Sequence, residues 1–141
     1  MAELSPPPSS QGRARATVEW AADSILEATA AESVFLWHQN TTILRQGVLG
    51  ESRAVTPGPI LEAARLSPAR ETYLPDLQAL PGRAEFGYLP RNTQAVLLQP
   101  LCAGESMLVL GTDRKRAFSP RDIAWVSALG SQLAPLLREV R

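Results

Sequence analysis

The side chains best suited to chemistry lie in one segment, 76–92, where charged residues stand among turn-forming ones. The charged members are Asp76, Arg83, Glu85 and Arg91. Arginine binds carboxylates and phosphates through two parallel N–H groups, so these residues can hold a small ligand or a partner loop by charge-assisted hydrogen bonds. The alternative is internal, with Arg83 or Arg91 pairing with Asp76 or Glu85 and tying the segment down.

Turn-forming residues in the same segment exclude long helices and strands there: Pro81, Gly82, Gly87 and Pro90. Loops of this length are uncommon in a compact domain and are often functional. We expect its two aromatic residues to pin the loop to a sheet. The sequence therefore predicts a ligand or partner site built from Asp76, Arg83, Glu85, Phe86, Tyr88 and Arg91.

The chain has one cysteine, Cys102, and one histidine, His38. Disulfides and cysteine-based metal sites need more than one thiol, so Cys102 is expected to be a small, partly buried side chain. His38 ends a predicted strand, and it is either an axial haem ligand or a surface residue at a hairpin end. Carboxylates paired for acid–base work are not evident. We expect no catalytic residue and no metal site, with haem as the one cofactor alternative.

Composition places limits on the partners and on the number of domains. The 14 basic and 14 acidic residues cancel, whereas nucleic-acid binders need a positive surplus, so no nucleic-acid partner is expected. An apolar fraction of 45% suffices for a core. The single thiol fits a reducing compartment, and we expect a cytoplasmic protein. Residues 1–12 are predicted to be a flexible Pro/Ser-rich lead-in, and residues 13–141 a single domain.

Three helices are expected. The first covers 13–30, with an apolar face at helical spacing: Val18, Ala21, Ala22, Ile25, Leu26 and Thr29. A short helix over 59–66 follows Thr56 as N-cap and Pro57 as first helical residue, and it turns inward Ile60, Ala63, Ala64 and Leu66. The last opens at Ser119 with Pro120 and Asp122, contains Pro135, and buries Val126, Leu129, Leu133, Leu136, Leu137 and Val140.

Five strand segments are expected from their β-branched, aromatic and apolar content: 33–38, 42–49, 71–74, 93–101 and 106–111. Asn40 and Gly104 suit the two short turns, so both hairpins are antiparallel. The fold class is α+β: an antiparallel sheet of five to six strands, with the terminal helices on one face and the 76–92 loop plus the short helix on the other.

An interface is expected on the terminal helices. Trp20 and Trp125 fall at the edges of their apolar faces, and Leu129 lies one helical turn after Trp125. Tryptophan is enriched at the energetic centres of interfaces. These residues predict a homodimer through the terminal helices, or docking to a membrane-bound partner, with core burial as the alternative.

Three strings resemble a GAF domain, the ligand-binding and dimerising module of many sensor proteins: YLPDLQALPG at 73–82, AVLLQPLCAGESMLVLG at 95–111 and AFSPRDIAWVSALGSQLAPLL at 117–137. The resemblance implies the fold described above. It does not extend to two known activities, since bilin attachment uses a helical cysteine beside a histidine, and methionine sulfoxide reduction needs a resolving thiol. A sensory module that binds a small ligand under the loop is one function that it implies.

A narrower resemblance is to the cofactor-assembly-of-complex-C family of cyanobacteria and chloroplasts. It rests on TILRQGVLG at 42–50, LPGRAEFGYLPRNTQAVLLQPL at 80–101 and the Ala-Trp pair at 124–125. This resemblance implies a non-enzymatic assembly or scaffold factor for haem attachment in the photosynthetic cytochrome bf complex. It also implies protein partners, among them membrane-bound assembly factors, and a place at the thylakoid periphery if a membrane anchor was removed.

Overall fold

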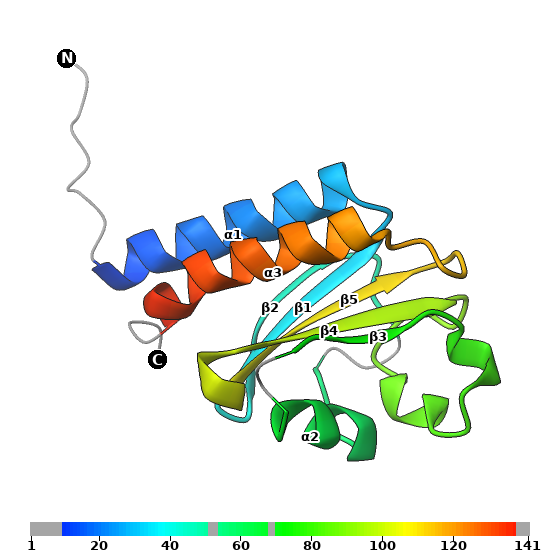
Figure 1. Ribbon diagram of the computed structural model, residues 1–141. Helices are drawn as coiled ribbons and strands as arrows, with labels where there is room; N and C mark the ends of the chain where they lie inside the picture. Colours follow the sequence, from blue (N-terminus) through cyan, green and yellow to red (C-terminus); the bar gives the residue numbers. More distant parts are fainter. Residues whose placement is uncertain (1–9, 51–53, 68–69, 138–141) are drawn as a thin grey trace.

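The computed structural model describes residues 10–50, 54–67 and 70–137, which form three layers. Two long helices cover one face of a curved sheet, and a short helix with the 76–92 loop covers the other (Figure 1). The helices are α1 (Ser10–Ala28), α2 (Pro59–Arg65) and α3 (Pro120–Leu137). The expected α+β arrangement, with the terminal helices on one face of the sheet and the loop and short helix on the other, is confirmed.

The sheet has five strands in the order β2-β1-β5-β4-β3, and every neighbouring pair is antiparallel. The strands are β1 (Ser33–His38), β2 (Thr41–Gly47), β3 (Thr72–Leu74), β4 (Ala95–Leu101) and β5 (Ser106–Thr112). β1, β4 and β5 are buried along their whole length, because both faces of the sheet are covered. β3 is the predicted edge strand and pairs with only the first part of β4.

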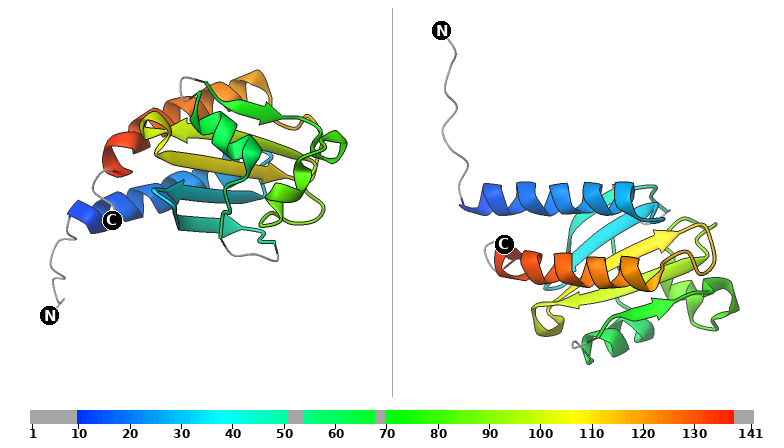
Figure 2. Two further views of the ribbon diagram at one scale, coloured as in Figure 1. Left: turned by 90° about the horizontal axis from the view of Figure 1, so that it is seen from below. Right: turned by 45° about the horizontal axis from the view of Figure 1, so that its top comes forward.

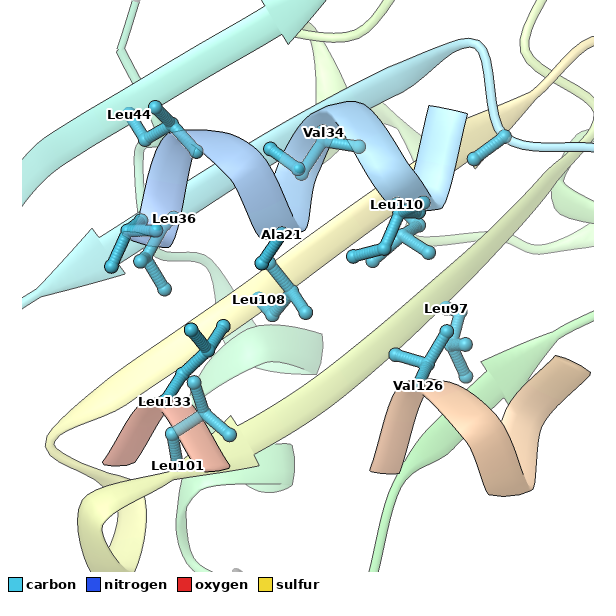
Figure 3. Packing of buried hydrophobic residues seen from close by; sticks show 14 of the residues in the cluster. Ala21, Val34, Leu36, Leu44, Leu97, Leu101, Leu108, Leu110, Val126 and Leu133 are labelled. Atoms are coloured by element: carbon cyan, nitrogen blue, oxygen red, sulfur yellow. The ribbon is translucent and has the colours of Figure 1, made fainter. Parts of the chain in front are cut away.

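The first core layer lies between the long helices and the sheet. α1 and α3 run antiparallel (Figure 1). Ala21, Val126 and Leu133 approach the sheet from them (Figure 3). The sheet contributes alternate residues of its strands to this layer: Val34, Leu36, Leu44, Leu97, Leu101, Leu108 and Leu110. This period of two follows from the pleat of a strand, which sends successive side chains to opposite faces.

The second core layer lies between the sheet and the α2–loop layer. The opposite side chains of the same strands form it: Phe35, Trp37, Val96, Leu98, Met107 and Val109. They pack against Leu61 and Ala64 of α2 and against the loop residues Leu77, Phe86, Tyr88 and Leu89. The loop is therefore part of the core on this face.

Several boundaries differ from the sequence-based expectation. α1 begins at Ser10, so three residues of the expected lead-in are helical, while residues 1–9 lie outside the described residues. β4 begins at Ala95, because the Thr93 N–H bonds to the Pro90 carbonyl at 3.0 Å. Of the expected face of α3, Val126, Leu133 and Leu137 are buried, whereas Val140 lies beyond the described range.

The expected start of α2 was wrong. Its N-cap is Gly58 and its first residue is Pro59, not Thr56 and Pro57. A residue before proline is forced toward an extended conformation, and Gly58, with φ −120° and ψ −173°, shows it. The helix cannot begin earlier, and its inward residues are Leu61 and Ala64, while Ala63 and Leu66 are exposed.

Gly47 ends β2 two residues earlier than expected. Its φ is +87°, and a Cβ added there would lie 2.1 Å from the Glu32 carbonyl oxygen. The next N–H, that of Val48, bonds to the same carbonyl at 2.8 Å and turns the chain away from the sheet. A side chain at position 47 would therefore meet the backbone of Glu32, which is why glycine stands at the end of this strand.

The two described ends of the chain lie at the same end of the helical layer. α1 begins near the place where α3 ends, and the 76–92 loop lies at the other end of the molecule in all the views of Figures 1 and 2.

Candidate functional site

The two ends of the 76–92 loop are joined by hydrogen bonds, so the loop closes into a ring. At its base, the Leu77 N–H bonds to the Gln94 carbonyl at 2.7 Å, and the Gln78 Nε2 donates to the Thr93 carbonyl at 3.0 Å. Two short 3₁₀ turns, Leu77–Ala79 and Arg83–Phe86, form its sides. A compact loop with joined ends is an Ω-loop, and such loops are frequently functional.

Glu85 joins this loop to α2. Its carboxylate accepts the backbone N–H groups of Ile60 at 2.8 Å and of Leu61 at 3.2 Å, which are donors of the first turn. The absence of a side chain at Gly58 makes room, because a Cβ there would lie 2.7 Å from the Glu85 side chain. A residue 24 positions away in the sequence therefore caps the helix.

Aromatic side chains fill the space between the loop and the sheet. The Tyr88 ring packs edge-on against Phe35 at 5.4 Å and against Phe86 at 6.0 Å between centroids. All three are buried, as is Trp37, whose ring lies 4.7 Å below the Arg65 guanidinium of α2. The expectation that Phe86 and Tyr88 pin the loop to the sheet is met by these contacts.

The Tyr88 hydroxyl is buried and has no hydrogen-bond partner within the described residues. Burial raises the pKa of this phenol, and the nearby Glu85 carboxylate raises it further, so Tyr88 stays protonated. An unpaired buried hydroxyl costs stability.

The outward side of the ring holds a cavity of about 600 Å³. Arg83 and Arg91 line it together with Gln78, and Leu77, Phe86 and Leu89 provide apolar wall. Leu49, which follows β2 and lies outside the loop, also lines the cavity and is 39% exposed. A smaller depression of about 440 Å³ lies between residues 56–58 and the loop.

The six loop residues predicted as one site are divided among three places. Arg83, Phe86 and Arg91 line the outward cavity, and Glu85 and Tyr88 line the depression beside residues 56–58. Asp76 lies at the base of the loop, with one carboxylate oxygen 3.8 Å from the Lys115 ammonium. The expected pairing of Arg83 with Asp76 or Glu85 is replaced by a bond from Arg83 Nη1 to the Gln78 carbonyl at 3.2 Å.

His38 and Cys102 each have a partner inside the protein. His38 is buried, contrary to the surface alternative, and its Nδ1 hydrogen-bonds to Ser106 Oγ across β1 and β5. The Cys102 thiol is half-buried and donates to the Ala134 carbonyl at 3.3 Å. Over the described ranges, there is no group of three His, Cys, Asp or Glu side chains placed to hold a metal ion.

The predicted interface residues lie on the outer layer. Trp20 of α1 is 61% exposed and Trp125 of α3 is 36% exposed, whereas Leu129 is partly buried against the first core layer. Among the residues that the structure describes, no helix is long and apolar enough to span a bilayer.

Sequence reasoning missed two features of the site. Val48 and Leu49 are exposed apolar residues, and Leu49 walls the outward cavity. The sequence-based expectation placed both inside the strand 42–49, whereas β2 ends at Gly47 and leaves them beyond the sheet. The cap formed by Glu85 had no local signal, because its partners are distant in the sequence.

Comparison with known proteins gives one family. The family of cofactor assembly of complex C, CCB2/CCB4, matches residues 6–133. The chloroplastic CCB4 protein of Arabidopsis thaliana, which is named for cofactor assembly of complex C, is 32% identical over 124 residues, which cover 81% of this chain. The chain spans 41% of the length of that relative.

Solved structures agree on the fold. A type II free methionine-R-sulfoxide reductase from Thermoplasma acidophilum aligns at a TM-score of 0.73 with 22% identity, over 93% of this chain and 96% of that one. A GAF domain region from Geobacter sulfurreducens aligns at 0.74 with 12% identity, over 91% and 95%. The fold is thus GAF-like, and the chain belongs to the CCB2/CCB4 family of cofactor assembly of complex C.

Proposed function

We propose that this chain is a non-enzymatic assembly or scaffold domain that supports haem attachment in the cytochrome bf complex. The observation that carries the proposal is the family match over residues 6–133. The name of the Arabidopsis relative describes cofactor assembly, and the domain corresponds to 41% of that protein. In this proposal the domain binds protein partners at the thylakoid periphery.

The interior supports a scaffold more than a reaction centre. An enzyme of this fold needs titratable groups gathered in a cleft. Here the His38 imidazole is buried against Ser106, and the Cys102 thiol is bonded to a backbone carbonyl. A sulfoxide-reducing cycle also needs a second thiol to resolve the sulfenic acid, and Cys102 is the single cysteine of the sequence.

The contact surface in this proposal is the outer side of the two long helices. The exposed Trp20 and Trp125 rings supply the large apolar area that interface centres use. A second copy of the chain bound there gives a homodimer, and a membrane-bound assembly factor is the other partner for the same face.

The alternative, a sensory module with a small ligand under the 76–92 loop, has less support. That volume is occupied by Phe35, Phe86 and Tyr88, which are each at most 4% exposed. A ligand there would have to displace core aromatic residues, and each such side chain contributes several kcal/mol, about 3–5, to stability.

The test uses the organism that encodes the chain. Deleting its gene is expected to abolish the covalently bound haem of the b-type cytochrome of the complex, while the haem-free polypeptide of that cytochrome remains detectable. Covalent haem survives a denaturing gel and is measured there by its peroxidase activity. Restoring the gene with Trp20→Glu and Trp125→Glu together is expected to leave the band weak, whereas Leu66→Glu, at an exposed position of the opposite layer, restores it. Unchanged haem staining in the deletion strain would refute the proposal.

A further inference from the structure

The cavity on the outward side of the 76–92 loop has the features of a small-molecule site that the assembly role does not use. We propose that it binds organic acids with an apolar body, with the carboxylate held by Arg83 and the body set against Leu77, Phe86 and Leu89. The proposal does not depend on haem attachment.

The walls of the cavity are preformed. The ends of the loop are joined by the bonds from Leu77 to Gln94 and from Gln78 to Thr93. The 3₁₀ turn that carries Arg83 is anchored, because Glu85 within it is bonded to two backbone N–H groups of α2. A rigid frame lowers the ordering cost of binding.

Arg83 is held across the loop with donors to spare. One of its terminal nitrogens, Nη1, donates to the Gln78 carbonyl at 3.2 Å, which directs the guanidinium across the ring. A guanidinium has five N–H donors in a planar fork, so further donors remain for a carboxylate. Arg91 also lines the same cavity.

The remaining wall is apolar and largely buried. Leu77, Phe86 and Leu89 are each 2–4% exposed, so each offers only a small surface to the cavity. Their positions are fixed, because all three belong to the second core layer. Leu49 is 39% exposed and lies at the cavity edge, where a bound body would cover it. A volume of about 600 Å³ falls within the range of small-molecule sites, which is roughly 300–1,000 Å³.

This combination selects one ligand chemistry. The described lining residues include two arginines and no carboxylate, so an anion is favoured over a cation. The planar fork favours a carboxylate that accepts two parallel N–H bonds, and the leucine and phenylalanine wall favours an apolar body over a sugar or a nucleotide.

The experiment is a titration of the whole chain, labelled with nitrogen-15, with 4-phenylbutyrate and, as a matched neutral compound, 4-phenylbutyramide. The amide resonances of Gln78, Ala84, Gly87 and Thr93 are expected to shift with the acid. The neutral amide is expected to bind about tenfold more weakly, since it lacks the charge-assisted bonds. N-acetyl-leucyl-phenylalanine, as the free acid, shows whether a peptide C-terminus or a small acid is the better source of the carboxylate.

Variants locate the site. Arg83→Gln is expected to weaken binding of 4-phenylbutyrate about tenfold, Arg83→Lys to recover part of it, and Arg13→Gln, on the opposite layer, to change nothing. Arg83 is exposed, so its variants keep the fold, which unchanged remaining resonances verify. Equal affinity for acid and neutral amide, shifts at other residues, or no shift with either acid at 10-millimolar concentration, about the weakest useful affinity, would overturn the assignment.

Discussion

Glu85 and Ile60 are joined by a hydrogen bond of 2.8 Å from the backbone N–H at the start of α2 to a carboxylate in the 76–92 loop. The second carboxylate oxygen binds the next N–H, that of Leu61, at 3.2 Å. One side chain thereby fixes two pieces of the same layer that are separated in the sequence. The stability of the loop and the stability of α2 are consequently coupled.

Replacing Glu85 by alanine should destabilise the protein by about 1–2 kcal/mol, because two N–H groups of the first helical turn lose their acceptor. The free energy of unfolding in urea, followed by circular dichroism, measures the loss. Hydrogen exchange of the Ile60 and Leu61 amides should accelerate by more than the average of the protein.

Glu85→Gln is the matched control. Glutamine keeps one acceptor oxygen in place, so a loss smaller than that of Glu85→Ala is expected. Equal stability of Glu85→Ala and the unmodified protein would contradict the capping role.

Gly47→Ala should be among the most damaging single-methyl additions. The methyl group would lie 2.1 Å from the Glu32 carbonyl oxygen, and the φ of +87° disfavours any side chain. We expect a loss of at least about 2 kcal/mol in the free energy of unfolding. Gly87→Ala is the comparison: its φ is −63° and the nearest atom to the new methyl is 3.8 Å away. Its effect should stay within about 0.5 kcal/mol, and equal losses would refute this reasoning.

Tyr88→Phe should leave the fold intact and raise the free energy of unfolding by about 1 kcal/mol. The variant removes a buried hydroxyl that has no partner among the described residues and keeps the ring contacts with Phe35 and Phe86. Thermal or urea unfolding measures the gain. A clear loss of stability would mean that the hydroxyl is hydrogen-bonded in solution.

Glu32 should make stability depend on pH. Partial burial raises the pKa of its carboxyl, and the neighbouring Asp113 carboxylate raises it further. The folded state therefore holds this proton more tightly than the unfolded state. Protonated Glu32 consequently adds to the free energy of unfolding below the ordinary pKa of about 4.3, and this addition is lost as pH rises through the higher pKa of the folded state.

Glu32→Gln cannot titrate and should not show that loss. The unfolding free energy of the variant should exceed that of the unmodified protein at neutral pH, and the difference should shrink toward acid pH. Urea unfolding at a series of pH values measures it, and a difference that grows toward acid pH would contradict the sign.

Trp20→Glu should weaken self-association, if the outer helical face joins two copies as proposed. Sedimentation or light scattering is expected to show a dimer for the unmodified chain and a monomer for the variant. Leu66→Glu is a suitable control, because Leu66 is 84% exposed on the opposite layer. If the unmodified chain is itself a monomer, the homodimer is refuted, and the outer helical face would then bind a different protein.

Much of the fold followed from local patterns in the sequence. The Ser119–Asp122 start of α3 was predictable, and the reciprocal bonds are present: the Asp122 N–H to Ser119 Oγ at 3.1 Å, and the Ser119 N–H to the Asp122 carboxylate at 3.0 Å. The Asn40 turn also holds, with φ of 46° at Gln39 and 65° at Asn40. These features depend on residues within four positions of each other.

The candidate site depends on contacts that no local pattern contains. Glu85 accepts hydrogen bonds from α2, which is distant in the sequence. The partner of the buried His38 is Ser106, which lies 68 positions later. The sequence did show that 76–92 was a long loop with charged residues. Which of these residues face outward depends on how the loop closes. The closure is fixed by the hydrogen bonds from the start of the loop to the carbonyls of Thr93 and Gln94.

The shared location of the start of α1 and the end of α3 has a practical meaning (Figure 1). An affinity tag, fluorophore or fused protein joined directly to the start of α1 or to the end of α3 lies on the side remote from the arginine-lined cavity. Immobilising the molecule by either of these helix ends should therefore leave that cavity open to the surrounding solution.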